Sequence, residues 1–261
     1  RKELWKVFEQ FRRTNQLKNQ ATFPEMTAIA ATVLKNRSEA GKPLPFDHVL
    51  VDEAQDFHAG HWMLLRNLVP VGDNDLFIAE DSHQRIYGQK VPLSRFDINI
   101  RGRARRLRLN YRTTMENLAY AISLLEGAEF RDILDEAEST EEYRSVRSGP
   151  DPKLVQAGSY GEETEVAARQ IRAWLDSGIK PDAIGVLIRT DQRVKAVTAE
   201  LREEGIRSNN DPGRITAGSG EIAVMTMHSA KGMEFHNVIV LGVAEQDIPA
   251  TWHFDKLPET E

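Results

Sequence analysis

The chain has 261 residues, 40% hydrophobic and 28% charged, which are ordinary values for a globular protein and suggest one large domain or two of about 150 residues or fewer. It has no cysteine and no apolar run near the roughly 18 residues of a membrane span, which excludes a disulfide framework, a thiolate metal site and the membrane class. The formal charge of −6 does not indicate a bulk polyanion binder, and the polar N-terminus leads us to expect no secretory signal.

The first 45 residues are predicted to form two amphipathic helices. One apolar stripe has the helical spacing i, i+1, i+4 and i+7 and consists of Leu4, Trp5, Phe8 and Phe11. A second stripe follows Phe23-Pro24 and consists of Met26, Ile29, Ala30, Val33 and Leu34. Gly41-Lys42-Pro43 is expected to end the second helix. We interpret the aromatic residues among them as core and not as ligand-binding residues.

Short apolar runs farther along the chain are predicted to be strands, at residues 48–51, 76–79, 154–157, 184–188, 222–225 and 238–241. Several are continuously apolar, which is typical of strands buried on both faces. Two helical stripes lie between them and end near Gly178 and Gly205, where left-handed C-caps are expected. Strands that alternate with helices predict an α/β fold with a mostly parallel sheet.

Two charged segments bear on organisation and binding. Residues 127–152 are acidic and end in Ser148-Gly149-Pro150-Asp151-Pro152, which favours a domain boundary there, although a boundary near Asn110 fits equally well. Residues 101–112 read RGRARRLRLNYR, with six arginines in twelve residues. Composition alone leaves open whether this segment contacts phosphates or is a solvated face.

The first candidate motif is the apolar run that ends in Asp52-Glu53-Ala54-Gln55-Asp56. Ligands bind at the carboxyl ends of parallel strands, and Asp52 there is a suitable oxygen ligand for Mg²⁺. Glu53 is placed to deprotonate a water molecule as a general base. A strand that runs into a solvated turn explains the same two residues, so the motif alone does not decide.

The second candidate motif is Ala79-Glu80-Asp81-Ser82-His83-Gln84-Arg85-Ile86-Tyr87-Gly88, which again follows an apolar run. The amide of Gln84 can donate to a phosphate oxygen and accept from water, so it can register a γ-phosphate. Tyr87 is a candidate for stacking on a base, with a half-buried core tyrosine as the alternative. His83 is interpreted as a loop residue, because no second histidine lies at metal-ligand spacing.

Two further motifs follow. In Leu109-Asn110-Tyr111-Arg112-Thr113, the tyrosine offers a stacking face for a purine and the arginine a guanidinium for phosphate charge. Residues 225–235 read MTMHSAKGMEF and offer hydroxyl, imidazole and ammonium groups to a phosphate or sugar. A polar loop that joins two strands is the alternative for the second of these motifs.

In their order along the chain, these four motifs resemble motifs II, III, IV and V of the UvrD/Rep family of superfamily-one DNA helicases, from about Leu4 to Pro249. The resemblance implies an α/β fold of RecA-like parallel-sheet lobes, as in P-loop NTPase helicases, with an incomplete first lobe and most of the second. Residues 1–112 would end the first lobe, 113–152 would form a helical and acidic connection, and 153–261 would form the second lobe. The implied activity is an ATP-dependent, Mg²⁺-requiring translocase on single-stranded or double-stranded DNA, in the cytoplasm and not at a membrane.

The resemblance also implies a role for each matching residue. Asp52 would be the Mg²⁺ ligand and Glu53 the general base, while Gln84 would sense the γ-phosphate. Tyr111 would stack on adenine, and Arg112 would act as an arginine finger. In the last motif, the ribose would be met by Glu234, the loop would be shaped by Lys231 and Gly232, and the DNA would be contacted by Thr226 and His228, together with Tyr87 of the second motif.

The sequence departs from the family pattern in several places. It contains no Gly-x-x-x-x-Gly-Lys-Ser/Thr loop, and its sole Gly-Lys pair, Gly41-Lys42, is followed by proline. Motif VI is also missing, so we expect a fragment that alone hydrolyses ATP poorly or not at all. Glu80 stands where the family usually has glycine, and Gln89 stands where a stacking tryptophan is common. The competing hypotheses are a non-catalytic helicase-like scaffold that binds DNA or protein, and a Mg²⁺-dependent nuclease.

Overall fold

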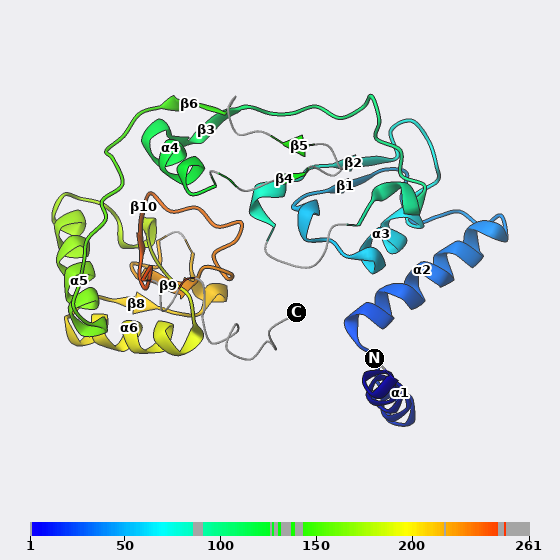
Figure 1. Cartoon of the computed structure of the whole chain (residues 1–261), viewed down its shortest axis with the longest axis horizontal. Helices are drawn as coiled ribbons and strands as arrows, with labels where there is room; N and C mark the ends of the chain where they lie inside the picture. The colour runs from blue at the N-terminus through cyan, green and yellow to red at the C-terminus, as the bar shows by residue number, and fades with distance from the viewer. Residues whose placement is uncertain are drawn as a thin grey trace. The chain divides into compact units, whose positions relative to one another are not determined.

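The computed structural model describes residues 2–85, 91–125, 127, 130–131, 137–138, 143–216, 218–244 and 248 (Figure 1). The chain divides into two compact units, Arg1–Pro152 and Lys153–Glu261. The division of the chain into three parts stays a prediction. Among the described residues, no helix is both long enough and apolar enough to cross a membrane.

The first unit begins with two helices, α1 (Lys2–Leu17) and α2 (Phe23–Glu39), as predicted. Thr22 caps α2: its hydroxyl accepts from the backbone N–H of Glu25, and its own N–H donates to the Glu25 carboxylate at 2.8 Å. These bonds hold the pKa of Glu25 below its usual value. Gly41 follows the end of α2 with φ of +66°, which confirms the predicted stop.

The prediction that the aromatic residues of the first stripe are core is wrong. Leu4 is 74% exposed, Trp5 57% and Phe11 50%. Helix α2 packs on helix α3 (Ala59–Arg66) and buries Ala31, while the side chains of Met26, Ile29 and Val33 stay exposed. Helical spacing of apolar residues identifies a helix and its apolar face, but it does not identify what covers that face.

A small parallel sheet lies next in the first unit. Strand β1 (Val49–Val51) pairs in parallel with β2 (Leu76–Ile78), so that two of the predicted strands are confirmed (Figure 1). Beside the sheet lies a core of Val51, Ala54, Trp62, Leu93 and Ile98. Arg66 at the end of α3 donates to the Asp75 carboxylate at 2.7 Å, which ties α3 to the start of β2.

The rest of the first unit contains strands that the apolar pattern did not predict. Strand β3 (Leu109–Thr114) pairs in parallel with β6 (Arg144–Arg147), and helix α4 (Met115–Ser123) follows β3 directly. Strands β4 (Phe130–Arg131) and β5 (Ala137–Glu138) form a short antiparallel pair. The strand predicted at residues 154–157 is wrong: the segment is irregular, and the side chains of Leu154 and Val155 are exposed, so burial does not favour a strand there.

The second unit has one four-stranded parallel sheet in the order β10-β7-β9-β8. Its strands are β7 (Ile184–Ile188), β8 (Ser208–Asn209), β9 (Ile222–Thr226) and β10 (Asn237–Val240). Helices α5 (Tyr160–Asp176) and α6 (Asp191–Glu203) complete the unit (Figure 1). Their side chains share a core with the sheet that includes Ile171, Ile184, Val197, Leu201 and Val224.

The glycines predicted at the ends of these helices have the expected backbone. Gly178 follows α5 with φ of +91°, and Gly205 follows α6 with φ of +76°. Left-handed residues at these positions end a helix without steric cost only when they are glycine. The parallel strand pairs and the two helices confirm the predicted parallel α/β arrangement in the second unit.

Candidate functional site

The candidate site of the first unit lies where β1 and β2 end. Beyond the strands, the N–H of Ala79 donates to the carbonyl of Val51 at 2.8 Å, and the N–H of Ala54 donates to the carbonyl of Ala79 at 3.1 Å. The segments that follow the two strands therefore stay side by side. The structure brings the DEAQD motif and the Glu80–Arg85 segment together at one sheet edge, the edge at which ligands bind in parallel sheets.

The two carboxylates after β1 have different surroundings. Asp52 is exposed, and its Oδ1 accepts from the backbone N–H of Glu53 at 2.9 Å. Glu53 is half-buried and adopts the left-handed conformation, with φ of +54°. That conformation costs a non-glycine residue about 1–2 kcal/mol. The backbone therefore turns sharply at Glu53, and the two neighbouring carboxylates enter different environments.

The side chain of Gln55 links the two motifs. It is 5% exposed. Its Nε2 donates to Oε2 of Glu53 at 2.6 Å, and its Oε1 accepts from the backbone N–H of Asp81 at 3.0 Å. Its backbone carbonyl accepts from Nε of Arg85 at 3.1 Å. One buried amide thus contacts the proposed general base and the loop after β2.

The Asp81 carboxylate organises the short turn that carries Gln84. Its Oδ2 accepts from Nε2 of Gln84 at 2.6 Å, and its Oδ1 accepts from the backbone N–H of His83 at 3.0 Å. Nδ1 of His83 lies 3.3 Å from the same Oδ1 of Asp81. The His83 ring packs against the rings of Phe130 and Tyr143. Gln84 is held by Asp81 with its side chain exposed, at a position that a ligand can reach.

Three further positions after β2 were singled out from the sequence, namely Glu80, Tyr87 and Gln89. Tyr87 and Gln89 lie outside the described residues. Glu80, the departure from the family pattern, is half-buried and directly precedes Asp81. Among the described residues, no group of three or more histidine, aspartate or glutamate side chains is arranged to hold a metal ion. Asp52 suits Mg²⁺ as an exposed carboxylate oxygen, and such an ion commonly completes its shell with water and phosphate oxygens.

Tyr111 and Arg112 lie on β3, in the other parallel pair of the first unit. The pairing of β3 with β6 is irregular between Asn110 and Thr114, and Oδ1 of Asn110 accepts from the N–H groups of Arg112 and Thr113 at 2.8 and 2.9 Å. This local side-chain bonding replaces strand pairing at the motif. Tyr111 is 69% exposed and Arg112 is exposed, so both side chains are accessible to a ligand.

The last motif forms the loop between β9 and β10 in the second unit. Thr226 ends β9, and its hydroxyl lies 2.9 Å from that of Ser229 and accepts from the N–H of Ser229 at 3.1 Å. His228 lies on the turn, with Nδ1 3.3 Å from a guanidinium nitrogen of Arg189 at the end of β7. The structure therefore places Thr226 and His228 at the carboxyl end of β9, beside the cation Arg189 at the carboxyl end of the adjacent strand β7.

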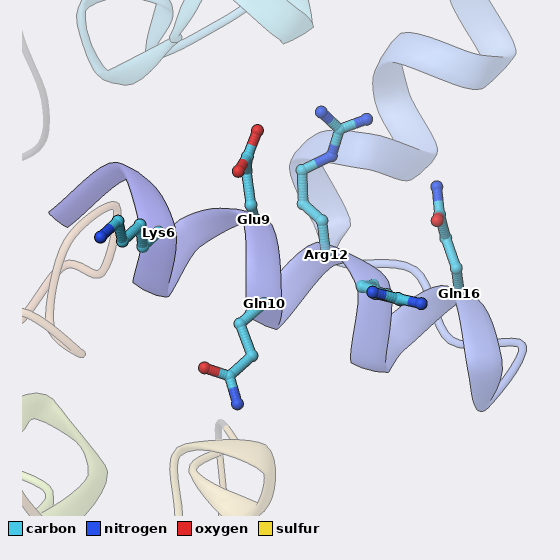
Figure 2. Close-up of a pocket in the computed structure, with 6 residues that line it drawn as sticks. Lys6, Glu9, Gln10, Arg12 and Gln16 are labelled. Atoms are coloured by element: carbon cyan, nitrogen blue, oxygen red, sulfur yellow. The ribbon is translucent and has the colours of Figure 1, made fainter. Parts of the chain in front are cut away.

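A hollow opens at the ends of β7 and β10 in the same unit. It is lined by residues that include Tyr160, Arg189, Thr190, Arg193 and Gly242. Figure 2 shows another hollow, along α1, where Glu9 and Arg12 point to one side of the helix and Gln10 to the other. Those side chains surround one helix and do not converge on a point, so the hollow along α1 carries no site.

The loop between β9 and β10 also carries Lys231, Gly232 and Glu234. Lys231 is half-buried, and Glu234 is exposed. Gly232 has φ of +78° with open space around it, so the backbone conformation and not crowding calls for glycine. The loop then returns to β10 through Phe235, whose ring covers Gly185 of β7 so closely that an added Cβ would lie 2.6 Å from it.

Three residues with evident roles in these geometries were not predicted, namely Gln55, Gly185 and Arg189. Gln55 lies inside the first motif, but only one of its two side-chain partners, Glu53, is close in sequence. The other partner, Asp81, lies 26 residues farther along the chain. Gly185 interrupts an otherwise apolar strand run, a signal typical of close approach to another group. Arg189 follows the same run directly, at the strand end where polar groups gather.

Comparison with known proteins agrees with the α/β fold and with the motifs described above. The model of the UvrD/REP helicase N-terminal domain matches residues 1–91, and that of the UvrD-like helicase C-terminal domain matches residues 207–261, together more than half of the chain. A Mycoplasma pneumoniae protein described as a probable DNA helicase is 24% identical over 247 residues, which cover 89% of this chain and 43% of that relative. The chain spans less than half the length of this relative. With its parallel α/β sheets, consistent with RecA-like lobes, the chain belongs to the UvrD/Rep family of DNA helicases.

Proposed function

We propose that this chain is part of an ATP-dependent helicase or translocase that couples ATP hydrolysis to movement along single-stranded DNA in the cytoplasm. The observation that carries the proposal is the hydrogen-bonded edge after β1 and β2. There Glu53 and Gln84 belong to one continuous network through Gln55 and Asp81. A general base linked by hydrogen bonds to a γ-phosphate sensor supports a site in which the two residues act together on ATP.

The roles at this edge follow from the surroundings of each residue. Exposed Asp52 would hold Mg²⁺, which when bound screens the phosphate charge. Half-buried Glu53 accepts a hydrogen bond from Gln55, which orients its carboxylate to take a proton from the attacking water. Gln84 would report the γ-phosphate, because its amide can exchange its bond to Asp81 for one to a phosphate oxygen.

The other motifs would supply the nucleotide and DNA contacts. Tyr111 offers an exposed ring for adenine, and Arg112 an exposed guanidinium for transition-state charge. In the second unit, Thr226 and His228 would approach the DNA backbone. Glu234 would meet the ribose, with Lys231 and Gly232 shaping the loop.

The test is ATP hydrolysis with and without single-stranded DNA, measured on this chain and on a longer polypeptide that extends it into its natural flanks. We expect DNA-stimulated turnover in the longer polypeptide and little in this chain, whose sequence has no phosphate-binding Gly-Lys-Ser/Thr loop. Inactivity of both, with DNA binding retained, would replace this proposal by a non-catalytic scaffold.

A further inference from the structure

We propose that Gln55 is a positioning residue that couples the general base Glu53 to the turn carrying Gln84. This inference rests on the function proposed above and concerns how two parts of that site act together. Gln55 is buried, and its side chain reaches from its own loop to the N–H of Asp81, 26 residues farther along the chain. No ligand contact is needed for this role, because Gln55 acts through Glu53 and Asp81.

The two partners of the Gln55 side chain require an amide in one orientation. The carboxylate of Glu53 is an acceptor, so it faces the NH₂ group of Gln55 at 2.6 Å. The backbone N–H of Asp81 is a donor, so it faces the amide oxygen at 3.0 Å. A flipped amide would oppose like groups at both ends. An amide alone among the neutral side chains of this length donates at one end and accepts at the other.

The surrounding backbone is held on both sides of this bridge. The N–H of Ala54 donates to the carbonyl of Ala79, and Arg85 donates to the carbonyl of Gln55 at 3.1 Å. The loop of Gln55 is thus fastened to both ends of the segment that contains Asp81 and Gln84. Since the Gln55 side chain is buried, an amide group there that loses its partner is left without a hydrogen bond at a cost in stability.

The Gln55 bridge completes a continuous hydrogen-bonded path between the side chain of Gln84 and the carboxylate of Glu53. Gln84 donates to the Asp81 carboxylate at 2.6 Å, the Asp81 N–H donates to Gln55, and Gln55 donates to Glu53. When Gln84 leaves Asp81 for a phosphate oxygen, the Asp81 carboxylate loses one of its hydrogen bonds, and any change in the position of the Asp81 backbone N–H reaches the Glu53 carboxylate through two hydrogen bonds. DNA-dependent movement of the turn would in this way change the orientation of the Glu53 carboxylate.

The experiment replaces Gln55 in the longer, ATP-hydrolysing polypeptide. Gln55→Met keeps the length of the side chain and removes both hydrogen bonds, whereas Gln55→Glu keeps an acceptor for Asp81 and opposes Glu53 with a second carboxylate. Gln170→Met, at a half-buried glutamine of α5 in the second unit, is the matched control. The readouts are kcat and KM for ATP with and without single-stranded DNA, deuterium exchange of the Asp81 amide and the thermal midpoint.

For Gln55→Met we expect the DNA-stimulated kcat to fall by about 10- to 100-fold, the range that misplacement of a catalytic group costs, with KM for ATP little changed. The ratio of stimulated to basal turnover should fall towards one, and the Asp81 amide should exchange faster. Gln55→Glu should lose stimulated turnover while the Asp81 amide stays protected. The control should behave as wild type.

A different pattern would overturn the inference. If Gln55→Met lowers the thermal midpoint but keeps the stimulation ratio, Gln55 is a structural residue of the loop. If Gln55→Glu keeps full stimulated turnover, the contact with Glu53 is not used. Absence of turnover in the wild-type longer polypeptide would instead overturn the proposed function, and this inference with it.

Discussion

The second unit leaves none of the surface of Ile171, Ile184 and Leu201 exposed, whereas the first unit leaves Leu4 and Trp5 more than half exposed. In the part of the chain that the structure describes, one four-stranded sheet supports the second unit, and three separate two-stranded sheets support the first. The residues proposed for ATP hydrolysis, Asp52, Glu53, Gln84 and Arg112, nevertheless lie in the first unit. There, hydrogen bonds through buried or half-buried polar groups do much of the positioning that a large apolar core does in the second.

The largest expected effect is on chemistry in the first unit. Arg112→Ala in the longer polypeptide should reduce ATP turnover by a factor on the order of 10³ or more, as loss of an arginine finger does. Steady-state kinetics measure this effect. Because Arg112 is exposed, the thermal midpoint should stay close to that of wild type. Unchanged turnover with weaker DNA binding would assign Arg112 to the arginine-rich segment instead.

The next effect is on the core of the second unit. Leu201→Ala should lower the free energy of unfolding by about 2–5 kcal/mol, because the side chain is fully buried. Leu4→Ala on α1 should change it by less than about 0.5 kcal/mol. Chemical denaturation of this chain followed by circular dichroism measures both. Similar losses for the two variants would mean that the stripe on α1 is packed.

A smaller effect is expected where the last motif rests on the second unit's sheet. Gly185→Ala would place a Cβ 2.6 Å from the ring of Phe235 and should cost about 1–3 kcal/mol of stability. Since Phe235 ends the loop of Thr226 and His228, affinity for single-stranded DNA should fall as well. Gly161→Ala, where the nearest atom is 3.9 Å away, is the control. Equal stability of both variants would show that Phe235 moves aside freely.

The smallest effect concerns pH and the first unit. Burial raises the pKa of Asp75, but hydrogen bonds from Arg66, Gly72 and Leu76 outweigh it, so the net pKa lies below the usual 3.8. This stabilisation is present above the unfolded-state pKa and is lost as pH falls through the lower folded-state pKa. Acid titration of stability should therefore show a steeper loss below about pH 4 in wild type than in Asp75→Asn. Identical slopes would contradict the role of the Arg66–Asp75 pair.

The sequence predicted those parts of the fold that depend on local periodicity. The strands β7, β9 and β10 are continuous apolar runs, and α5 and α6 have apolar stripes that end in glycine. Strand β3 was not predicted, because it is short of apolar residues and is held by Asn110 and Ser145. The partners of an apolar stripe also lie outside local periodicity, as the exposed side chains of α1 demonstrate.

For the candidate site, the sequence indicated the positions of its motifs but not the links between them. Parallel strands predict that Glu53 and Gln84 lie at one edge, and they do. The bridge through Gln55 depends on a hydrogen bond between residues 26 positions apart, which no spacing rule supplies.

The most direct test of the central claim is Glu53→Gln in the longer polypeptide, because this change keeps the shape of the side chain and removes its basicity. We expect ATP turnover with single-stranded DNA to be abolished while ATP binding, measured by equilibrium titration, stays close to that of wild type. Wild-type turnover in this variant would contradict the account, since the edge after β1 and β2 would then not supply the base.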